Sequence, residues 1–237
     1  MAFLRFIVRA AGVPVELGDD GSDAFLRRPT NSDISRVRDQ SQTVEPFDLP
    51  PPGEAEQLWR LYFTTVNMMV PCVHEDSFRT TYKRARNDGP RTVTRSWLAM
   101  LNMVFALATN VLTATSPPRE RASRSDMYFE RAMELVRQDI LGRISVEHGM
   151  FSMIVISSNF FPWSPSLELT PKTVQVFLLM GIYLEGTTSS SLAWTFHSLT
   201  VKGAYQLGLH YLGSKNHSLL DREIRRRAWY CCIMNDR

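Results

Sequence analysis

The chain has 237 residues, of which 44% are hydrophobic and 22% are charged, and its formal net charge is +3 at pH 7. A chain of this length can bury a core without disulfides or metals, and so small a charge does not by itself imply a polyanionic partner. Its three cysteines, Cys72, Cys231 and Cys232, exclude a disulfide framework and a self-contained zinc module of four or six cysteines. No run reaches the roughly 18 apolar residues that a membrane span requires, so no membrane partner is expected.

Residues 1–53 form the first segment of the chain. After residue 12 this segment lacks helical periodicity and is rich in Asp, Ser, Arg and Pro, and it ends in Leu-Pro-Pro-Pro-Gly at positions 49–53. We therefore expect a poorly ordered N-terminal arm or linker. Arg5 and Arg9 interrupt the apolar start, which argues against a secretory signal, and the acids Asp19, Asp20 and Asp23 argue against a mitochondrial presequence.

From Glu54 onward apolar residues recur at steps of three and four, as is typical of amphipathic helices. The first predicted helix begins near Glu54 and ends at Pro71, because proline stops a helix. The second begins at Asp76 or Ser77, either of which is a suitable N-cap residue. The third helix covers about residues 97–112.

Four further helices complete the prediction. One spans about 123–141, and Ser123 and Asp126 have the spacing of a capping pair at its start. The next begins at Thr170-Pro171, and residues 174–184 are apolar on most sides, which predicts a buried helix. A sixth spans 191–207 and is closed by Gly208, and a seventh begins near Ser218 and continues to the chain end. No alternating pattern indicates a strand, so the predicted fold is all-α, a helical array of about seven helices with a disordered N-terminal arm.

Catalytic and metal-binding patterns are weak. Cys72 and His74 share a loop with two acids, but a metal site needs three or four ligands, and no third catalytic partner can be named. We expect a buried cysteine and a hydrogen-bonded histidine at these positions, with no catalytic residue and no cofactor or metal bound by this chain. The basic run at 222–227 has three readings: a nuclear localisation patch, a DNA-contacting surface, or a helix start with internal ion pairs, which the spacing of Glu223 and Arg227 favours.

The C-terminal segment resembles the fungal-specific transcription factor regulatory domain, the middle homology region of binuclear zinc-cluster regulators, also known as the xylanolytic activator-type regulatory domain. That family carries a pattern of Glu-x-Arg-Arg-Arg-x-Trp-Trp followed by Asp-Arg. The matching residues here are Glu223, Arg225, Arg226, Arg227, Trp229, Asp236 and Arg237, with Tyr230 in place of the second tryptophan.

Two further segments resemble the same family in the same order. Pro71, His74 and Phe78 match its opening helix and turn, and Trp194, Gly208 and His210 match its "Ala-Trp … Leu-Gly-Leu-His" helix. The resemblance covers residues 54–237 and implies a non-enzymatic, all-α domain that acts in DNA-templated transcription regulation in the nucleus. It also implies regulatory proteins or the transcription machinery as partners, with a small effector as a further candidate.

The chain departs from the family in three ways. The six-cysteine zinc cluster is absent, so zinc and DNA contacts are expected only through a cluster that this chain lacks. The chain stops at Arg237, where the family's domain continues, so we interpret 54–237 as a partial domain. Joining Glu147 to Thr173 restores the family pattern, so residues 148–172 are interpreted either as a retained intron or as a real insertion. The alternative function is a stand-alone helical ligand-binding or protein-interaction module, in which Trp59, Trp97, Trp194 and Trp229 enclose a small effector.

Overall fold

The computed structural model describes residues 45–112, 117–141, 169–186, 190–211 and 217–235. All regular secondary structure in these ranges is helical, which confirms the all-α prediction. Within these described ranges, seven helices have 13 residues or more, as the sequence predicted, and they are accompanied by a four-residue helix and a 3-10 turn. In chain order the elements are α3 (Pro52–Thr64), α4 (Val66–Met69), α5 (Glu75–Asn87), η2 (Pro90–Thr92), α6 (Arg95–Val111), α7 (Pro118–Leu141), α9 (Pro171–Glu185), α10 (Ser190–Gln206) and α11 (Leu219–Asn235).

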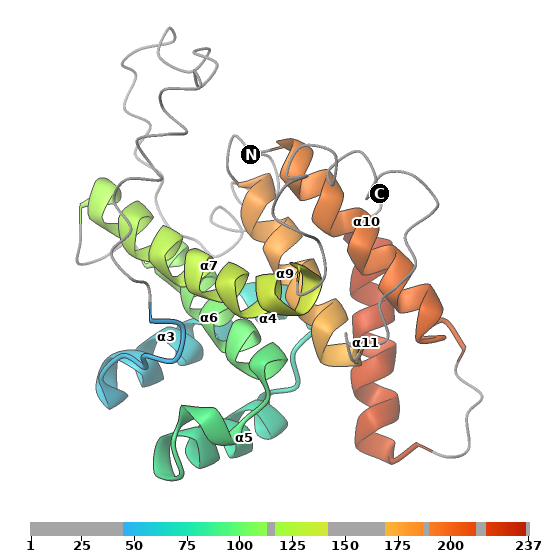
Figure 1. Cartoon of the computed structure of the whole chain (residues 1–237), viewed down its shortest axis with the longest axis horizontal. Helices are drawn as coiled ribbons and strands as arrows, with labels where there is room; N and C mark the ends of the chain where they lie inside the picture. Colours follow the sequence, from blue (N-terminus) through green and yellow to red (C-terminus); the bar gives the residue numbers. More distant parts are fainter. Residues whose placement is uncertain (1–44, 113–116, 142–168, 187–189, 212–216, 236–237) are drawn as a thin grey trace, which may run out of the picture.

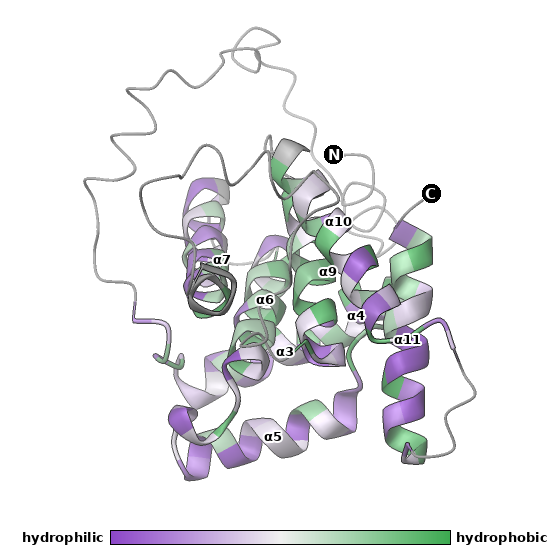
Figure 2. Cartoon of the chain, turned by 45° about the vertical axis from the view of Figure 1, so that its right-hand side comes forward, coloured by the Kyte–Doolittle hydropathy of each residue, from purple (hydrophilic) through white to green (hydrophobic). Residues whose placement is uncertain are grey.

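Helices α6 and α9 form the centre of the fold (Figure 1). Helix α6 packs against α3, α7 and α9, and α9 packs in turn against α10 and α11. Both central helices are buried almost along their whole length, whereas the outer helix α5 buries only Phe78 and Ala85. The hydropathy colouring in Figure 2 shows the same contrast between α6 and α9, which are largely hydrophobic, and α5, which is largely hydrophilic. None of the helices in the described ranges is long and apolar enough to cross a membrane.

Three predicted helix boundaries were correct in physical detail. Thr170 caps α9 through a reciprocal capping box with Thr173, and Pro171 occupies its first turn. The Ser218 hydroxyl accepts from the backbone N–H of Asp221 at 3.1 Å and donates to its carboxylate at 2.9 Å, at the start of α11. Gly208 closes α10 with a φ of +60°.

Three other predicted boundaries were wrong. Helix α3 ends at Thr64 rather than at Pro71, and the hydroxyls of Thr64 and Thr65 both bond to the Leu61 carbonyl, which competes with the helical ladder there. Helix α5 is capped by His74, not by Asp76 or Ser77.

Helix α7 begins at Pro118, five residues before the predicted start, so Ser123 lies inside the helix. The nearby polar residues bond to other helices instead of capping α7. The Ser125 hydroxyl donates to the Ala106 carbonyl at 2.8 Å, and Asp126 accepts from the Tyr183 hydroxyl at 2.6 Å.

The described end of the N-terminal arm, residues 45–51, lies against the helices. Phe47 and Leu49 pack against the core, and the Asp48 carboxylate pairs with Arg131 of α7 at 3.1 Å. Pro52 and Gly53, the last two residues of the predicted arm, instead form the start of α3, because proline is tolerated in the first turn of a helix. Residues 1–44 lie outside the described residues, as does most of the insertion at 148–172. The last residues of that stretch, Leu169 to Lys172, lead into and begin α9.

Candidate functional site

The turn between α4 and α5 contains the first family motif. The His74 ring accepts the backbone N–H of Ser77 at 3.3 Å, and the His74 carbonyl accepts the Ser77 hydroxyl at 3.1 Å, so this histidine holds the start of α5. Phe78 is buried and packs edge-on against Phe63, with 5.3 Å between ring centroids, and against Trp97 at 5.6 Å. Within the motif, His74 and Phe78 therefore have structural roles, and Pro71 is exposed.

Cys72 lies in the same turn and joins it to two distant helices. Its thiol lies 3.9 Å from the Tyr62 hydroxyl and interacts with the Cys231 thiol of α11. The buried side chain of Gln175, on α9, donates to the Cys72 carbonyl. The interaction with Cys231 and complete burial together hold the pKa of the Cys72 thiol well above its ordinary value. A neutral, inaccessible thiol is unsuited to nucleophilic attack.

The second motif forms the C-terminal end of α10. The Gly208 N–H donates to the Tyr205 carbonyl and the Leu209 N–H to the Ala204 carbonyl, each at 2.9 Å. This pair of bonds is a Schellman motif, in which the residue at C′ adopts the left-handed conformation that glycine tolerates. Leu209 follows the glycine and is buried in a small apolar cluster together with Ala204, Ala228 and Cys232. The motif therefore ends α10 and anchors its end between α9 and α11.

The third motif, on α11, contacts the same place, the junction where the end of α10 meets α9 and α11. The Arg225 guanidinium donates to the Leu207 carbonyl at the end of α10. Trp229 packs against Tyr205 and His210, with ring centroids 5.3 and 5.6 Å away, and these two rings lie 5.1 Å apart. The structure thus brings the motif residues Gly208, His210, Arg225 and Trp229 together, although the two motifs are separate in the sequence.

The remaining arginines of the third motif are paired within α11. The Glu223 carboxylate accepts two bonds from Arg226, at 2.8 and 2.9 Å, and one from Arg227 at 2.6 Å. These bonds, to Arg226 first and to Arg227 second, lower the pKa of Glu223 to about 2. The predicted pair of Glu223 and Arg227 is present, which favours the reading of this run as a helix with internal ion pairs.

The predicted tryptophan cavity is not formed, and the last two motif residues cannot be placed. Trp194 is 71% exposed, whereas Trp59 and Trp97 are buried among core residues, so the four predicted tryptophans do not gather around one effector cavity. The reason is that Trp194 lies on the solvent face of α10, opposite the buried Ala193 and Phe196. Asp236 and Arg237 lie outside the described residues. Within the described ranges, no group of three or more metal-ligating side chains is present.

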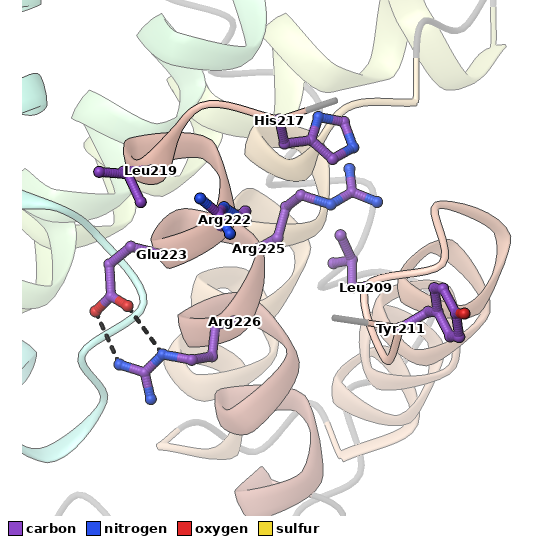
Figure 3. Close-up of a pocket in the computed structure, with 8 residues that line it drawn as sticks. All are labelled: Leu209, Tyr211, His217, Leu219, Arg222, Glu223, Arg225 and Arg226. Carbon is purple, nitrogen blue, oxygen red and sulfur yellow. Dashed lines mark hydrogen bonds and ion pairs between the residues drawn. The ribbon is translucent and has the colours of Figure 1, made fainter. Parts of the chain in front are cut away.

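A pocket of about 330 Å³ opens beside the N-terminal half of α11, and its lining side chains are shown in Figure 3. Apolar lining comes from Leu209, Tyr211 and Leu219, and the charged or polar lining comes from His217, Arg222, Glu223, Arg225 and Arg226. Glu223, Arg225 and Arg226 belong to the third motif, Arg222 to the basic run at 222–227 and Leu209 to the second motif, all of which the sequence indicated. Tyr211, His217 and Leu219 were missed. The missed residues belong to a turn and a helix start, where hydrophobic periodicity carries no signal.

Comparisons with known proteins identify the family of this chain. Residues 59–237 match the family model of the fungal-specific transcription factor domain. Transcription factor FBD3 of Gibberella moniliformis is 33% identical over 97% of this chain and 29% of its own length. Sorbicillinoid biosynthetic cluster transcription factor 2 of Penicillium rubens is 28% identical over 80% of this chain and 25% of its own length. Transcription regulator galc of Aspergillus niger is 23% identical over 81% of this chain and 21% of its own length.

The chain spans less than a third of the length of these relatives. No solved structure matches it. The family model covers most of the chain and includes all three motifs described above. The protein therefore belongs to the fungal-specific transcription factor domain family.

Proposed function

We propose that this chain is the non-enzymatic regulatory domain of a zinc-cluster transcription regulator that acts in the nucleus. The observation that carries the proposal is the convergence of the three motifs around α9. The α4–α5 turn is bonded to Gln175 of α9, while the end of α10 and the face of α11 share an apolar cluster with Val174. Residues that close helix ends and join helices make a rigid body that can present surfaces to partners.

The chemistry of the motif residues supports a role without catalysis. Cys72 is buried with a raised pKa, and the acceptor nitrogen of His74 is occupied by the helix cap. Neither residue is arranged as a nucleophile or as a general base, because each is already engaged in holding the fold.

Sequence-specific DNA contact is assigned to a zinc cluster outside this chain. A binuclear cluster needs six cysteines and this chain has three, so the zinc ions of the full regulator would be held elsewhere. Arg226 and Arg227 are paired with Glu223, and Arg225 is bonded to a backbone carbonyl. These arginines therefore do not form a row of free cations of the kind that follows a phosphate backbone.

Exposed apolar side chains on α10 and α11 support regulatory proteins or the transcription machinery as partners. Trp194, Tyr230 and Met234 are 71%, 55% and 64% exposed. Aromatic residues and methionine are enriched in protein interfaces, where they contribute much of the binding energy. A small effector is a second candidate partner, and the pocket beside α11 is the observation that favours it, because its volume lies at the lower end of ligand sites.

The test fuses the full chain to a heterologous sequence-specific DNA-binding domain and measures a nuclear reporter. We expect output to differ at least twofold from that of the DNA-binding domain alone, and Trp194→Ala to reduce the difference. Met68→Ala is the matched control, because Met68 is equally exposed, at 75%, but lies on α4. A reporter that does not respond to the fusion would contradict the regulatory role. Sequence-specific binding by the unfused chain in a gel-shift assay at physiological salt would contradict the assignment of DNA contact.

A stand-alone helical interaction module is the alternative function. The transcript upstream of the Met1 codon separates the two readings. Six cysteines at zinc-cluster spacing followed by a basic segment would support the regulator, whereas an in-frame stop codon just upstream would favour the stand-alone module.

A further inference from the structure

The pocket beside α11 combines apolar walls with positive charge. Leu209 is only 1% exposed and forms a buried wall, whereas Tyr211 and Leu219 are 71% and 78% exposed. Figure 3 shows Arg225 extending between His217 and Leu209, while Glu223 and Arg226 pair on the opposite side of α11. An apolar side chain that entered this recess would cover surface that water now contacts, and this burial is favourable.

The charge of the pocket is only partly neutralised. Arg226 is compensated by Glu223, but Arg225 donates to a neutral carbonyl and keeps its full charge. Arg222 is exposed, and among the described residues neither it nor Arg225 belongs to an ion pair within 4.0 Å. Both arginines lie in the first two turns of α11, where the helix dipole adds positive potential. The complementary ligand is therefore acidic and carries a bulky apolar group.

The chain itself contains such a segment. Between Arg9 and Arg27 there is no basic residue, and four acids fall within eight positions from Glu16 to Asp23. Phe25 and Leu26 follow after one intervening residue, Ala24. The alignment with the Gibberella relative covers 97% of this chain, so it extends into this N-terminal segment.

We propose that residues 16–26 bind the pocket beside α11, with their carboxylates against Arg222 and Arg225 and with Phe25 and Leu26 against the apolar walls. The connection is long enough. The chain between Leu26 and Glu45 can span about 60 Å when extended, whereas the radius of gyration expected for a domain of this length is about 18 Å. A tethered segment experiences an effective concentration in the millimolar range. A segment with a dissociation constant near 0.1 mM would then occupy the pocket about 90% of the time.

The test measures competition by fluorescence anisotropy, with a labelled peptide of residues 13–26 and the full chain. The parent chain's own segment should compete with the peptide. We therefore expect the variant that carries Asp19→Asn, Asp20→Asn and Asp23→Asn to bind the peptide about tenfold more tightly than the parent. Adding Arg222→Glu to that variant should weaken binding at least tenfold. Higher salt should weaken it as well, because exposed charges are screened.

Matched controls separate the pocket from general charge effects. Arg119→Glu changes an exposed arginine in the first turn of α7 and should leave peptide binding unchanged. A peptide with Phe25→Ala and Leu26→Ala should bind several-fold more weakly than the native peptide. Equal thermal midpoints of the variants confirm that each one is folded.

Three outcomes would overturn the proposal. Equal peptide affinity of the parent and the arm-neutralised chain would show that the segment does not compete. Unchanged binding after Arg222→Glu would place the peptide elsewhere on the molecule. Concentration-dependent dimerisation of the parent that the three Asp→Asn changes abolish would show that the segment binds a second copy.

Discussion

Gly208 ends α10 with a φ of +60°, and substituting it tests whether the second family motif is a structural device. A Cβ built at this position has no atom within 4 Å, so Gly208→Ala introduces backbone strain without a steric clash. Left-handed geometry costs a non-glycine residue about 1–2 kcal/mol. Alanine also restricts the unfolded chain, which raises the free energy of unfolding by about 0.4–1 kcal/mol. The net loss in the free energy of unfolding should therefore be about 1 kcal/mol.

Gly53→Ala is the matched control. Gly53 lies in the first turn of α3, where the backbone suits any L-residue, and its Cβ also meets nothing within 4 Å. The effect on the unfolded chain is the same for both glycines, so their difference isolates the strain at Gly208. We expect Gly53→Ala to raise stability and the two variants to differ by about 1–2 kcal/mol. Gly208→Asn should fall between them, because asparagine tolerates the left-handed region better than alanine.

Urea denaturation at constant pH measures these differences, and an unchanged m-value confirms that the variants unfold from equally compact states. For a domain of this size, 1 kcal/mol corresponds to about 2–4 °C in the thermal midpoint. Gly208→Ala should therefore melt about 2–8 °C below Gly53→Ala. If Gly208→Ala is as stable as Gly53→Ala, the Schellman geometry and the structural reading of this motif are both wrong.

Three further predictions concern the same junction. In urea denaturation, Gly203→Ala should be at least about 1 kcal/mol less stable than Gly181→Ala, although both substitutions remove a helical glycine. A Cβ at Gly203 would meet side-chain atoms at 3.2 and 3.3 Å, whereas the atoms nearest to a Cβ at Gly181 are 4.0 Å away, so equal stability of the two variants would refute the close packing at Gly203. Arg225→Met should lower the free energy of unfolding by about 1.5 kcal/mol, because it removes a charged hydrogen bond to the Leu207 carbonyl, while Arg226→Met should change the free energy little. Equal losses in the two variants would contradict the structural role of Arg225. NMR should show the carboxyl of Glu223 titrating near pH 2. The stability that its ion pairs contribute is therefore present above the ordinary pKa of 4.5 and is lost as the pH falls through 2, and a Glu223 carboxyl with an ordinary pKa would disprove those pairs.

The sequence predicted the helix content well, because hydrophobic periodicity is a local signal. It also predicted the caps at Thr170 and Ser218, whose acceptors lie within three residues of the donors that they satisfy. It failed where a polar side chain bonds to another helix. Asp126 suggested a helix start by its type and spacing, yet it accepts from Tyr183, 57 positions further along the chain. No local pattern reveals such a partner.

The candidate site shows the same division. The pairing of Glu223 with Arg227 follows from a spacing of four residues on one helix, and the sequence predicted it. The bond from Arg225 to the Leu207 carbonyl joins two helices and was not predictable, although both residues lie in recognised motifs. The prediction that Trp194 lines an internal cavity failed for a related reason, because a tryptophan is large and apolar whether it fills a core or an interface.

These contacts indicate that the motif residues stabilise the fold, whereas their exposed neighbours are available to bind partners. His74 starts α5, Gly208 ends α10, and Arg225 satisfies a carbonyl that the end of α10 leaves free. Changes at these positions should alter stability first and regulation only as a consequence. Trp194 and Arg222 are exposed, so substituting them can change the binding of a partner without a loss of stability. A variant that loses regulation but keeps its thermal midpoint should therefore map to the exposed faces of α10 and α11 rather than to the closures between the helices.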